Sequence, residues 1–261
     1  MSQFEDITYA AQGGIANIVI NRPQVRNAVR PQTYEELTRA ISIAADDPEV
    51  GVVVLSGAGD KAFCAGGDVG DQSKRYPEVG RTHMRRLIAL STAMRMIDKP
   101  IIAKVRGYCV GGGVGLALAC DLRICTEGSK FAVPAAKLSL GYRYSGLKKL
   151  VDVVGPSFAK EIFYTARQFT AQEAQGMGLV NRVVPDAELE SYVQNYAETI
   201  AGNAPLTVDS VKFIVGEILK DPADRDMDKA EAMVQACFAS ADYIEGRKAF
   251  MEKRKPKFTG K

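Results

Sequence analysis

The sequence has no tryptophan, a single histidine and no apolar run that reaches the ~18 residues of a membrane-spanning helix. Its five cysteines form no C-x-x-C pair, which argues against a disulfide scaffold or a zinc site and is typical of a reducing compartment. The first residues, MSQFEDITYAAQGG, lack the basic flank and the apolar core of a secretion signal. We therefore expect a cytoplasmic protein that uses neither a membrane nor a bound metal.

Several common catalytic and nucleotide-binding motifs are also missing. His83 is the only histidine and no G-x-S-x-G occurs, which excludes a serine triad of the usual kind. No G-x-x-x-x-G-K-[ST] is present, and Leu116 stands where a dinucleotide fingerprint beginning at Gly111 and Gly113 needs its third glycine. The 34 Lys and Arg residues nearly balance the 31 acidic ones, so the net charge of +3 does not favour a nucleic-acid partner.

Strand-like and helical patterns alternate along the first three quarters of the chain. The expected elements are strands at residues 7–11 and 15–20, a helix at 31–45, a strand from 50, a helix at 81–97, a strand at 100–107, a glycine-started helix at 111–120 and a strand at 121–125. This alternation predicts an α/β fold with parallel strands and outer helices. Because almost everything after residue 186 reads as helix, we divide the chain into a core, 1–199, and a C-terminal helical region, 200–261.

Two glycine loops stand out, each placed directly after a predicted strand. The first is Ala65-Gly66-Gly67-Asp68, and the second, Gly111-Gly112-Gly113, also opens a helix. Glycine lets a substrate carbonyl approach the backbone closely, and the amides of a helix amino terminus carry partial positive charge. Either loop alone is explained by a tight turn, but the two together, on successive strand–helix units, predict an oxyanion site.

The order of several motifs resembles the crotonase superfamily, also called the enoyl-CoA hydratase/isomerase family. The resemblance covers essentially the whole chain and rests on NRPQVRNAV, KAFCAGGDV, KPIIAKVRGYCVGGGVGLALACDLRI, TAQEAQGMGLVNRVVP and EGRKAFMEKRKP. It implies a spiral of ββα units, a C-terminal helical region that packs in homotrimers, often paired as hexamers, and an acyl-CoA substrate. Coenzyme A would then enter as part of the substrate, and we expect no separate cofactor.

The family pattern also implies roles for individual positions. It assigns the two amides that hold the thioester oxygen, which are the catalytic groups, to Gly67 and Gly112. Around them it implies substrate contacts at Val25, Arg26, Ala28, Ala65, Gly66, Asp68, Gly111, Gly115, Ala135 and Tyr144. The basic tail around Lys253 would approach a 3′-phosphate of coenzyme A, although a run of charge at a chain end is also typical of a solvated tail.

Two departures from the family pattern bear on the chemistry. Hydratases of this family carry one glutamate two residues after the glycine triplet and another after a proline, and here those positions hold Gly115 and Ala135. Hydration needs one group to activate water and one to protonate carbon, and neither glycine nor alanine can do so. We therefore expect a reaction that forms an enolate without the usual glutamate pair.

The segment LSLGYRYSGLKKL replaces the glycine-rich segment of the hydratases. Its register is similar to that of superfamily members that decarboxylate methylmalonyl-CoA, and the resemblance points to Tyr142 as a catalytic hydrogen-bond donor to a substrate carboxylate, with Tyr144 close by. Simple packing of these tyrosines in a loop is the alternative.

Three functions therefore stay open at this point. The first is decarboxylation or C–C bond hydrolysis of an acyl-CoA. The second is a hydratase or isomerase whose acid and base have moved to Asp68, Asp71 or Tyr142. The third is an acyl-CoA binding protein without catalysis.

Overall fold

The structure is a computed structural model, and it describes residues 4–68 and 79–261, with side chains of 79–84 left out. Its larger sheet has six strands in the order β1-β2-β3-β5-β7-β10. β1 and β2 are antiparallel, and each following neighbour is parallel. The strands are β1 (Ile7–Gln12), β2 (Ile15–Ile20), β3 (Val52–Gly57), β5 (Ile101–Val105), β7 (Leu122–Thr126) and β10 (Arg182–Val184).

The smaller sheet shows how the chain winds. It has four short strands in the order β4-β6-β8-β9, namely β4 (Ala62–Cys64), β6 (Tyr108–Val110), β8 (Lys130–Ala132) and β9 (Phe169–Thr170). Each of β3, β5 and β7 is followed by one of these short strands and then by a helical segment, so the chain advances by one place in both sheets per ββα turn. The spiral that the family resemblance implies is confirmed.

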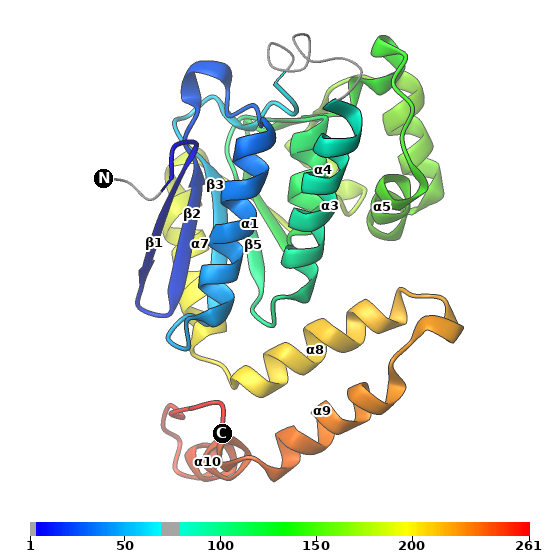
Figure 1. The fold of residues 1–261 in the computed structure, drawn as a ribbon. Coiled ribbons are helices and arrows are strands. Elements are labelled where there is room, and N and C mark those ends of the chain that lie inside the picture. The colour runs from blue at the N-terminus through cyan, green and yellow to red at the C-terminus, as the bar shows by residue number, and fades with distance from the viewer. Residues whose placement is uncertain (1–3, 69–78) are drawn as a thin grey trace.

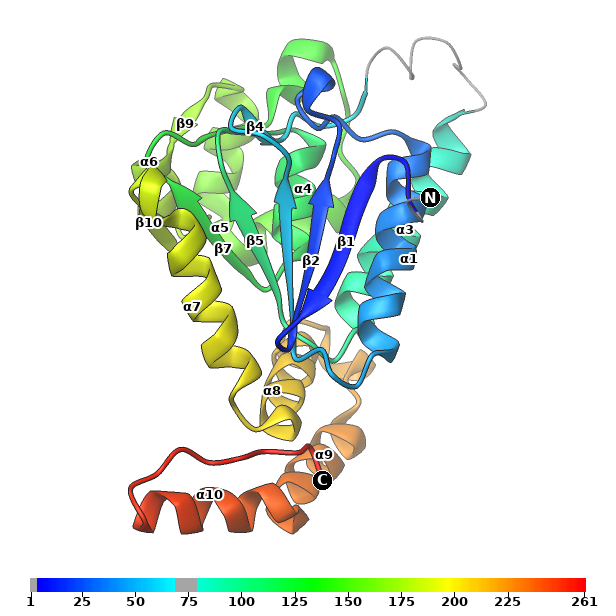
Figure 2. The same ribbon diagram turned by 90° about the vertical axis from the view of Figure 1, so that its left-hand side faces the viewer.

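Helices cover both faces of the larger sheet (Figures 1 and 2). On one face α7 (Leu189–Ala201) packs through Leu189 and Val193 on the inward residues of β3 and its neighbours, among them Val52 and Val54. The alternate residues Val53 and Leu55 enter the main core on the other face. That core is closed by α1 (Pro31–Asp46), α3 (Val79–Met96), α4 (Gly112–Ala119), α5 (Tyr144–Thr165) and α6 (Ala171–Gly176).

Most expected elements are present, and the differences concern the short strands. The hairpin, the helix from Pro31, the helix of α3 and the strand β7 lie within about two residues of their expected ends. The sequence analysis missed β4, β6, β8 and β9, because strands of two or three residues contain too few residues to show a period of two.

Three further helices extend below the core as an arm (Figure 1). They are α8 (Pro205–Ile218), α9 (Met227–Ala239) and α10 (Ala241–Met251), and we call residues 205–261 the C-terminal arm. Lys212 fastens α8 to the core, donating to the carbonyl of Lys99 at 2.8 Å and to Asp121 Oδ2 at 2.9 Å. None of the helices in the described ranges is both long and apolar enough to cross a membrane.

Candidate active site

The loop after β4 turns the amide N–H of Gly67 away from the neighbouring segment at Val29. Val29 donates to the carbonyl of Gly66 at 2.8 Å, and Asp68 donates to the carbonyl of Val29 at 2.9 Å, which together form a parallel bridge. In such a bridge the central residue turns its own N–H away from the neighbouring strand. The N–H of Gly67 therefore points away from Val29.

The start of α4 faces this amide. Gly112 is the first residue of α4, so its N–H has no partner within the helix. A Cβ placed on Gly112 would lie 3.5 Å from Gly67 N and 3.5 Å from Gly66 Cα, which shows that the two loops are in contact. The two amides thus meet at the carboxyl ends of β4 and β6, and we call the space between them the oxyanion site.

Glycine is required on both sides of this contact. Gly66 has φ +96°, and a Cβ there would come within 2.9 Å of the carbonyl oxygen of Val110. A Cβ on Gly113 would lie 2.2 Å from the carbonyl oxygen of Cys64, so α4 sits directly on the end of β4. The glycine triplet therefore serves packing as well as chemistry, and packing alone accounts for Gly113.

The loop at residues 25–28 adjoins the oxyanion site. The amide of Ala65 donates to the carbonyl of Arg26 at 3.0 Å, which brings Val25, Arg26 and Ala28 next to the 65–68 loop. The guanidinium of Arg26 lies 5.7 Å from the ring centre of the half-exposed Tyr108 on β6. The structure thus brings together three of the segments to which the sequence assigns substrate contacts.

Asn27 holds this loop in place, and the sequence reading missed it. Its φ is +56°, and its buried side chain donates to the carbonyls of Ala58 at 2.9 Å and Ala62 at 2.7 Å while accepting from the amide of Arg22 at 3.0 Å. Asparagine tolerates a positive φ better than most residues. An asparagine in a predicted turn was the only signal available.

The two candidate tyrosines differ in their surroundings. The ring of Tyr142 makes an edge contact with Phe163, with 4.7 Å between ring centres, and it lies against Gly146. Burial raises the pKa of Tyr142, so its phenol stays protonated at neutral pH and can donate a hydrogen bond. Tyr144, the first residue of α5, is 78% exposed and extends into solvent.

Buried groups lie beside Tyr142 and the oxyanion loop. Burial first, and then the nearby Cys64 and Tyr142, raise the pKa of Tyr34 on α1. The same burial raises the pKa of Cys64 to about 12, although the amide of Gly66 donates to its sulfur at 3.4 Å. Both groups are therefore neutral at physiological pH, and Cys64 is no nucleophile there.

The two positions that hold glutamate in hydratases lie in different elements, Gly115 in α4 and Ala135 in the short helix that precedes α5. Gly115, next to the first turn of α4, is exposed, and a Cβ placed on it would meet nothing within 4 Å. Ala135 is buried in the 3-10 helix Pro134–Leu138, whose last turn is closed by the amide of Leu140 donating to the Ala135 carbonyl at 3.0 Å. The position of Gly115 therefore has room for the first atom of a side chain.

The remaining candidates do not join this group. Lys253 follows α10, in the arm, at the end of the molecule opposite the loop after β4 (Figure 2). Asp71 and the side chain of His83 lie outside the described residues. Among the residues that the structure does describe, no three His, Cys, Asp or Glu side chains gather as a metal site would require.

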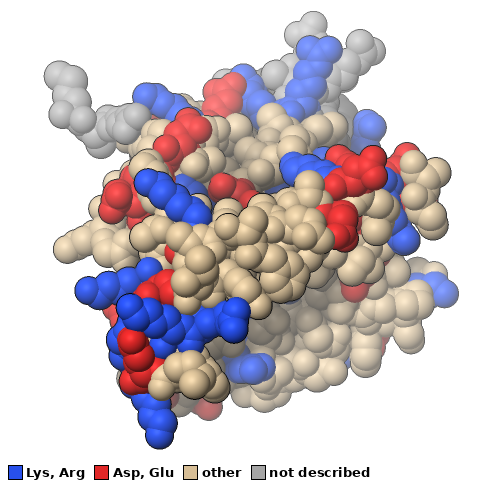
Figure 3. Space-filling view, turned by 90° about the horizontal axis from the view of Figure 1, so that it is seen from below, with Lys and Arg blue, Asp and Glu red and all other residues tan. Residues whose placement is uncertain are grey.

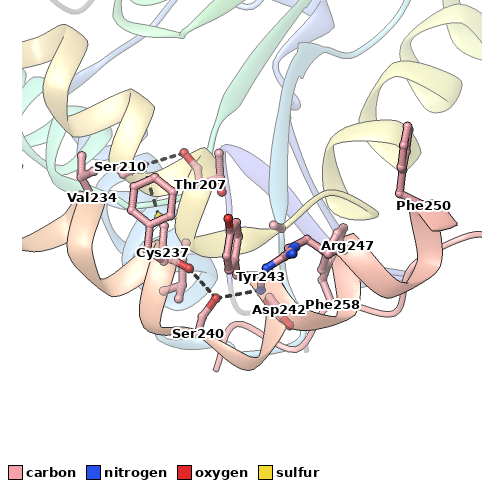
Figure 4. Close-up of a pocket in the computed structure, with 14 residues that line it drawn as sticks. Thr207, Ser210, Val234, Cys237, Ser240, Asp242, Tyr243, Arg247, Phe250 and Phe258 are labelled. Atoms are coloured by element: carbon pink, nitrogen blue, oxygen red, sulfur yellow. Dashed lines mark hydrogen bonds between the residues drawn. The ribbon is translucent and has the colours of Figure 1, made fainter.

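Two cavities lie away from the oxyanion site. One of about 550 Å³ opens between α8, α9 and α10, with Cys237, Phe238, Tyr243 and Phe258 among its walls (Figure 4). Another of about 480 Å³ lies beside Lys104, Arg106 and Glu190, where these charged groups pair with each other and with Asp186.

Comparisons with known proteins find similar sequences and structures over nearly the whole chain. The model of the enoyl-CoA hydratase/isomerase family matches residues 10–261. An enoyl-CoA hydratase/carnithine racemase from Magnetospirillum magneticum is 34% identical, with 99% of this chain and 97% of that chain covered and a TM-score of 0.90. An enoyl-CoA hydratase from Bacillus anthracis is 32% identical, covering 98% and 100% with a TM-score of 0.90. An enoyl-CoA hydratase/isomerase family protein from Hyphomonas neptunium is 32% identical, covering 100% of both chains with a TM-score of 0.92.

Proposed function

Since the chain belongs to the enoyl-CoA hydratase/isomerase family, we propose that it is an enzyme that converts an acyl-CoA thioester through an enolate held by Gly67 and Gly112. The observation that carries the proposal is the contact between the two glycine loops, with 3.5 Å from a Cβ on Gly112 to Gly67 N. Two convergent donors stabilise negative charge on the thioester oxygen, and removal of one such donor costs about 10² to 10³ in rate.

Within this family we favour decarboxylation or C–C bond hydrolysis over simple hydration. Gly115 and Ala135 supply no acid or base, whereas the protonated Tyr142 can donate a hydrogen bond to a substrate carboxylate. In decarboxylation the bond between the α carbon and the carboxylate breaks, its electron pair moves to the thioester oxygen, and carbon dioxide leaves. A proton on the α carbon completes the reaction. This path needs no group to activate water, and hydrolysis does need one.

A hydratase with relocated acid and base is the second candidate, and the names of similar structures favour it. The arrangement around Asp68 speaks against that residue as the base, because Arg22 already binds its carboxylate at 3.0 Å. An acyl-CoA binding protein without catalysis is the third candidate. The packing role of Gly113 supports it, since the contact with β4 requires a glycine at that position without any catalysis.

The discriminating experiment is a substrate panel read by mass spectrometry. The protein is incubated separately with crotonyl-CoA, methylmalonyl-CoA and a cyclic β-keto acyl-CoA. Loss of carbon dioxide or ring opening supports the proposal, and addition of water to crotonyl-CoA at a rate usual for the family supports the second candidate. Tight binding of all three without any product supports the third.

We also propose that the arm joins chains into a homotrimer or hexamer. Apolar side chains project from it into solvent, with Ile244 69% and Phe250 83% exposed. The face of the arm seen from below has a broad area without charge, bordered by basic and acidic side chains (Figure 3). An apolar area of this kind is typical of an interface. A neighbouring chain would also be needed for Lys253 to reach a substrate.

A cytoplasmic location stays a prediction from the sequence.

A further inference from the structure

The guanidinium of Arg22 is buried at the junction of three segments around the oxyanion site. Its Nη1 donates to the carbonyl of Ala28, and its Nη2 donates to Asp68 Oδ2 at 3.0 Å. Its Nε lies 3.4 Å from Asp6 Oδ1, and only 11% of the side chain is exposed. A buried arginine with three partners of this kind holds those partners in fixed relative positions.

Two of the three partners flank the bridge that orients Gly67. Ala28 directly precedes Val29, which pairs with Gly67, and Asp68 directly follows Gly67. Arg22 therefore joins the segment at Ala28 to the loop that carries the Gly67 amide. Without it, the two segments would still be joined by backbone hydrogen bonds, two at Val29 and one from the amide of Ala65 to the carbonyl of Arg26.

The third partner, Asp6, anchors the arginine to the core. Its side chain is 3% exposed, and it accepts hydrogen bonds from Arg30 Nε at 2.8 Å and from Thr33 Oγ1 at 2.6 Å. Burial alone would raise the pKa of Asp6, but the hydrogen bonds from Arg30 and Thr33 and the charge of Arg22 hold it below its ordinary value. Asp6 is thus a fixed anion, and it holds the guanidinium of Arg22 in one position.

We propose that Arg22 is a positioning residue, which aims the Gly67 amide into the oxyanion site and neutralises Asp68 beside it. The inference rests on the proposed function, because it concerns the same two amides. The negative charge of Asp68, adjacent to Gly67, would repel the negative charge that develops on the thioester oxygen. The guanidinium of Arg22, 3.0 Å from Asp68 Oδ2, offsets that charge and fixes the loop at the same time.

The test measures the hydrogen bonds to a bound carbonyl directly. Butyryl-CoA carrying ¹³C at the thioester carbonyl is bound to the protein, and its stretching band is recorded by difference infrared spectroscopy. Donation from Gly67 and Gly112 lowers the band frequency in the wild type. The Arg22→Met variant should lose a large part of this shift, and kcat on the substrate found in the panel should fall about 10- to 100-fold with KM changed less than about threefold.

A matched control separates positioning from general loss of stability. Arg30→Met removes another arginine from the same Asp6 but touches neither Ala28 nor Asp68. It should leave the carbonyl shift at the wild-type value. Arg22→Lys keeps the charge but cannot reach all three partners, so an intermediate shift is expected, and it serves where Arg22→Met does not fold.

Asp68→Asn tests the electrostatic half of the proposal. Alone it should change the shift little, because an amide oxygen still accepts from Arg22. Combined with Arg22→Met it should restore part of the lost kcat, since the negative charge beside Gly67 is gone. A purely structural role predicts that the double variant is as poor as Arg22→Met or worse.

The outcomes identify which inference fails. An absent carbonyl shift in the wild type would overturn the oxyanion site itself, and the role of Arg22 with it. A normal wild-type shift that persists in folded Arg22→Met and Arg22→Lys would overturn the role of Arg22 alone. Equal losses in Arg22→Met and Arg30→Met would do the same.

Discussion

Both ends of the molecule leave apolar side chains in solvent, but they do so in different chemical settings. At the end with the oxyanion site, Leu138 and Leu140 are exposed on the segment that leads to Tyr142, and this end also carries the amides of Gly67 and Gly112, which we propose as donors. On the arm, Ile244 and Phe250 are exposed on regular helices whose amides are already bonded. Free donors beside apolar surface are typical of a small-molecule site, and apolar surface without donors is typical of a protein interface.

The largest effect should appear in the hydration reaction itself, at the end with the oxyanion site. The wild-type protein should hydrate crotonyl-CoA more slowly than a glutamate-bearing relative by about 10² to 10⁴ for each missing group. Loss of the conjugated absorbance of crotonyl-CoA measures the rate. Gly115→Glu together with Ala135→Glu should raise it, and the open space at Gly115 accepts the first atoms of the new side chain. Brisk hydration by the unmodified protein would contradict the prediction and make the second candidate function correct.

Removal of one amide should have the next largest effect. Gly112→Pro deletes the N–H at the first position of α4, where proline is otherwise tolerated, and kcat should fall about 10² to 10³-fold. Gly112→Ala keeps this N–H and adds a Cβ whose nearest neighbours would lie at 3.5 Å, so it is the control and should lose much less activity. Association of the chains should not change, because the substitution is at the opposite end from the arm. Equal kcat for both variants would show that Gly112 donates nothing to the reaction.

A charge on the arm should have the opposite result, with association weakened. Ile244→Asp places a carboxylate on the exposed apolar side of α10 and should weaken self-association at least about tenfold, which analytical ultracentrifugation measures. Gln235→Asp adds the same charge on an exposed polar position of α9 and should leave association unchanged. A wild-type chain that sediments as a monomer at micromolar concentration would refute the assignment of the arm.

The smallest effect should be on stability, through Asp6. Its pKa is lower in the folded protein than in the unfolded chain, so the stabilisation is present above about pH 4 and is lost as the pH falls through the folded value. Asp6→Asn should lower the free energy of unfolding at pH 7 by about 1 to 3 kcal/mol and flatten its decline in acid. Urea unfolding between pH 3 and pH 7 measures both. Asp46→Asn, at an exposed site on the same side of the core, is the control. Identical acid profiles for Asp6→Asn and the wild type would contradict the prediction.

The glycine loops were predictable because their geometry leaves few other residues acceptable. Gly66 and Gly113 have neighbours that exclude any Cβ, so the sequence carries a direct trace of the contact. The long amphipathic elements, such as α1, were predictable for a similar reason, since burial on one face imposes a period.

Other features leave no such trace. Arg22 and Asp6 are ordinary charged residues in the sequence, and only the folded chain brings them into one buried network with Asp68. Lys253 shows the opposite case, a basic residue near the end of the chain that lies far from the loops to which the family pattern relates it. The distance between two segments depends on the topology of the fold, and the local periodicity of the sequence does not determine that topology.

The division of the oxyanion site between two turns of the spiral also bears on how the chain folds. Gly67 follows the second strand of one ββα turn and Gly112 begins the helix of the next, so the site comes into existence only when β4 and β6 have paired. Such pairing between distant segments is formed late and slowly compared with local helices. An acyl-CoA that binds the finished site binds nothing in the unfolded chain, and it therefore shifts the equilibrium toward the docked pair of turns. Binding of an acyl-CoA would therefore stabilise the fold itself, and thioester binding during refolding would report when β4 and β6 have paired.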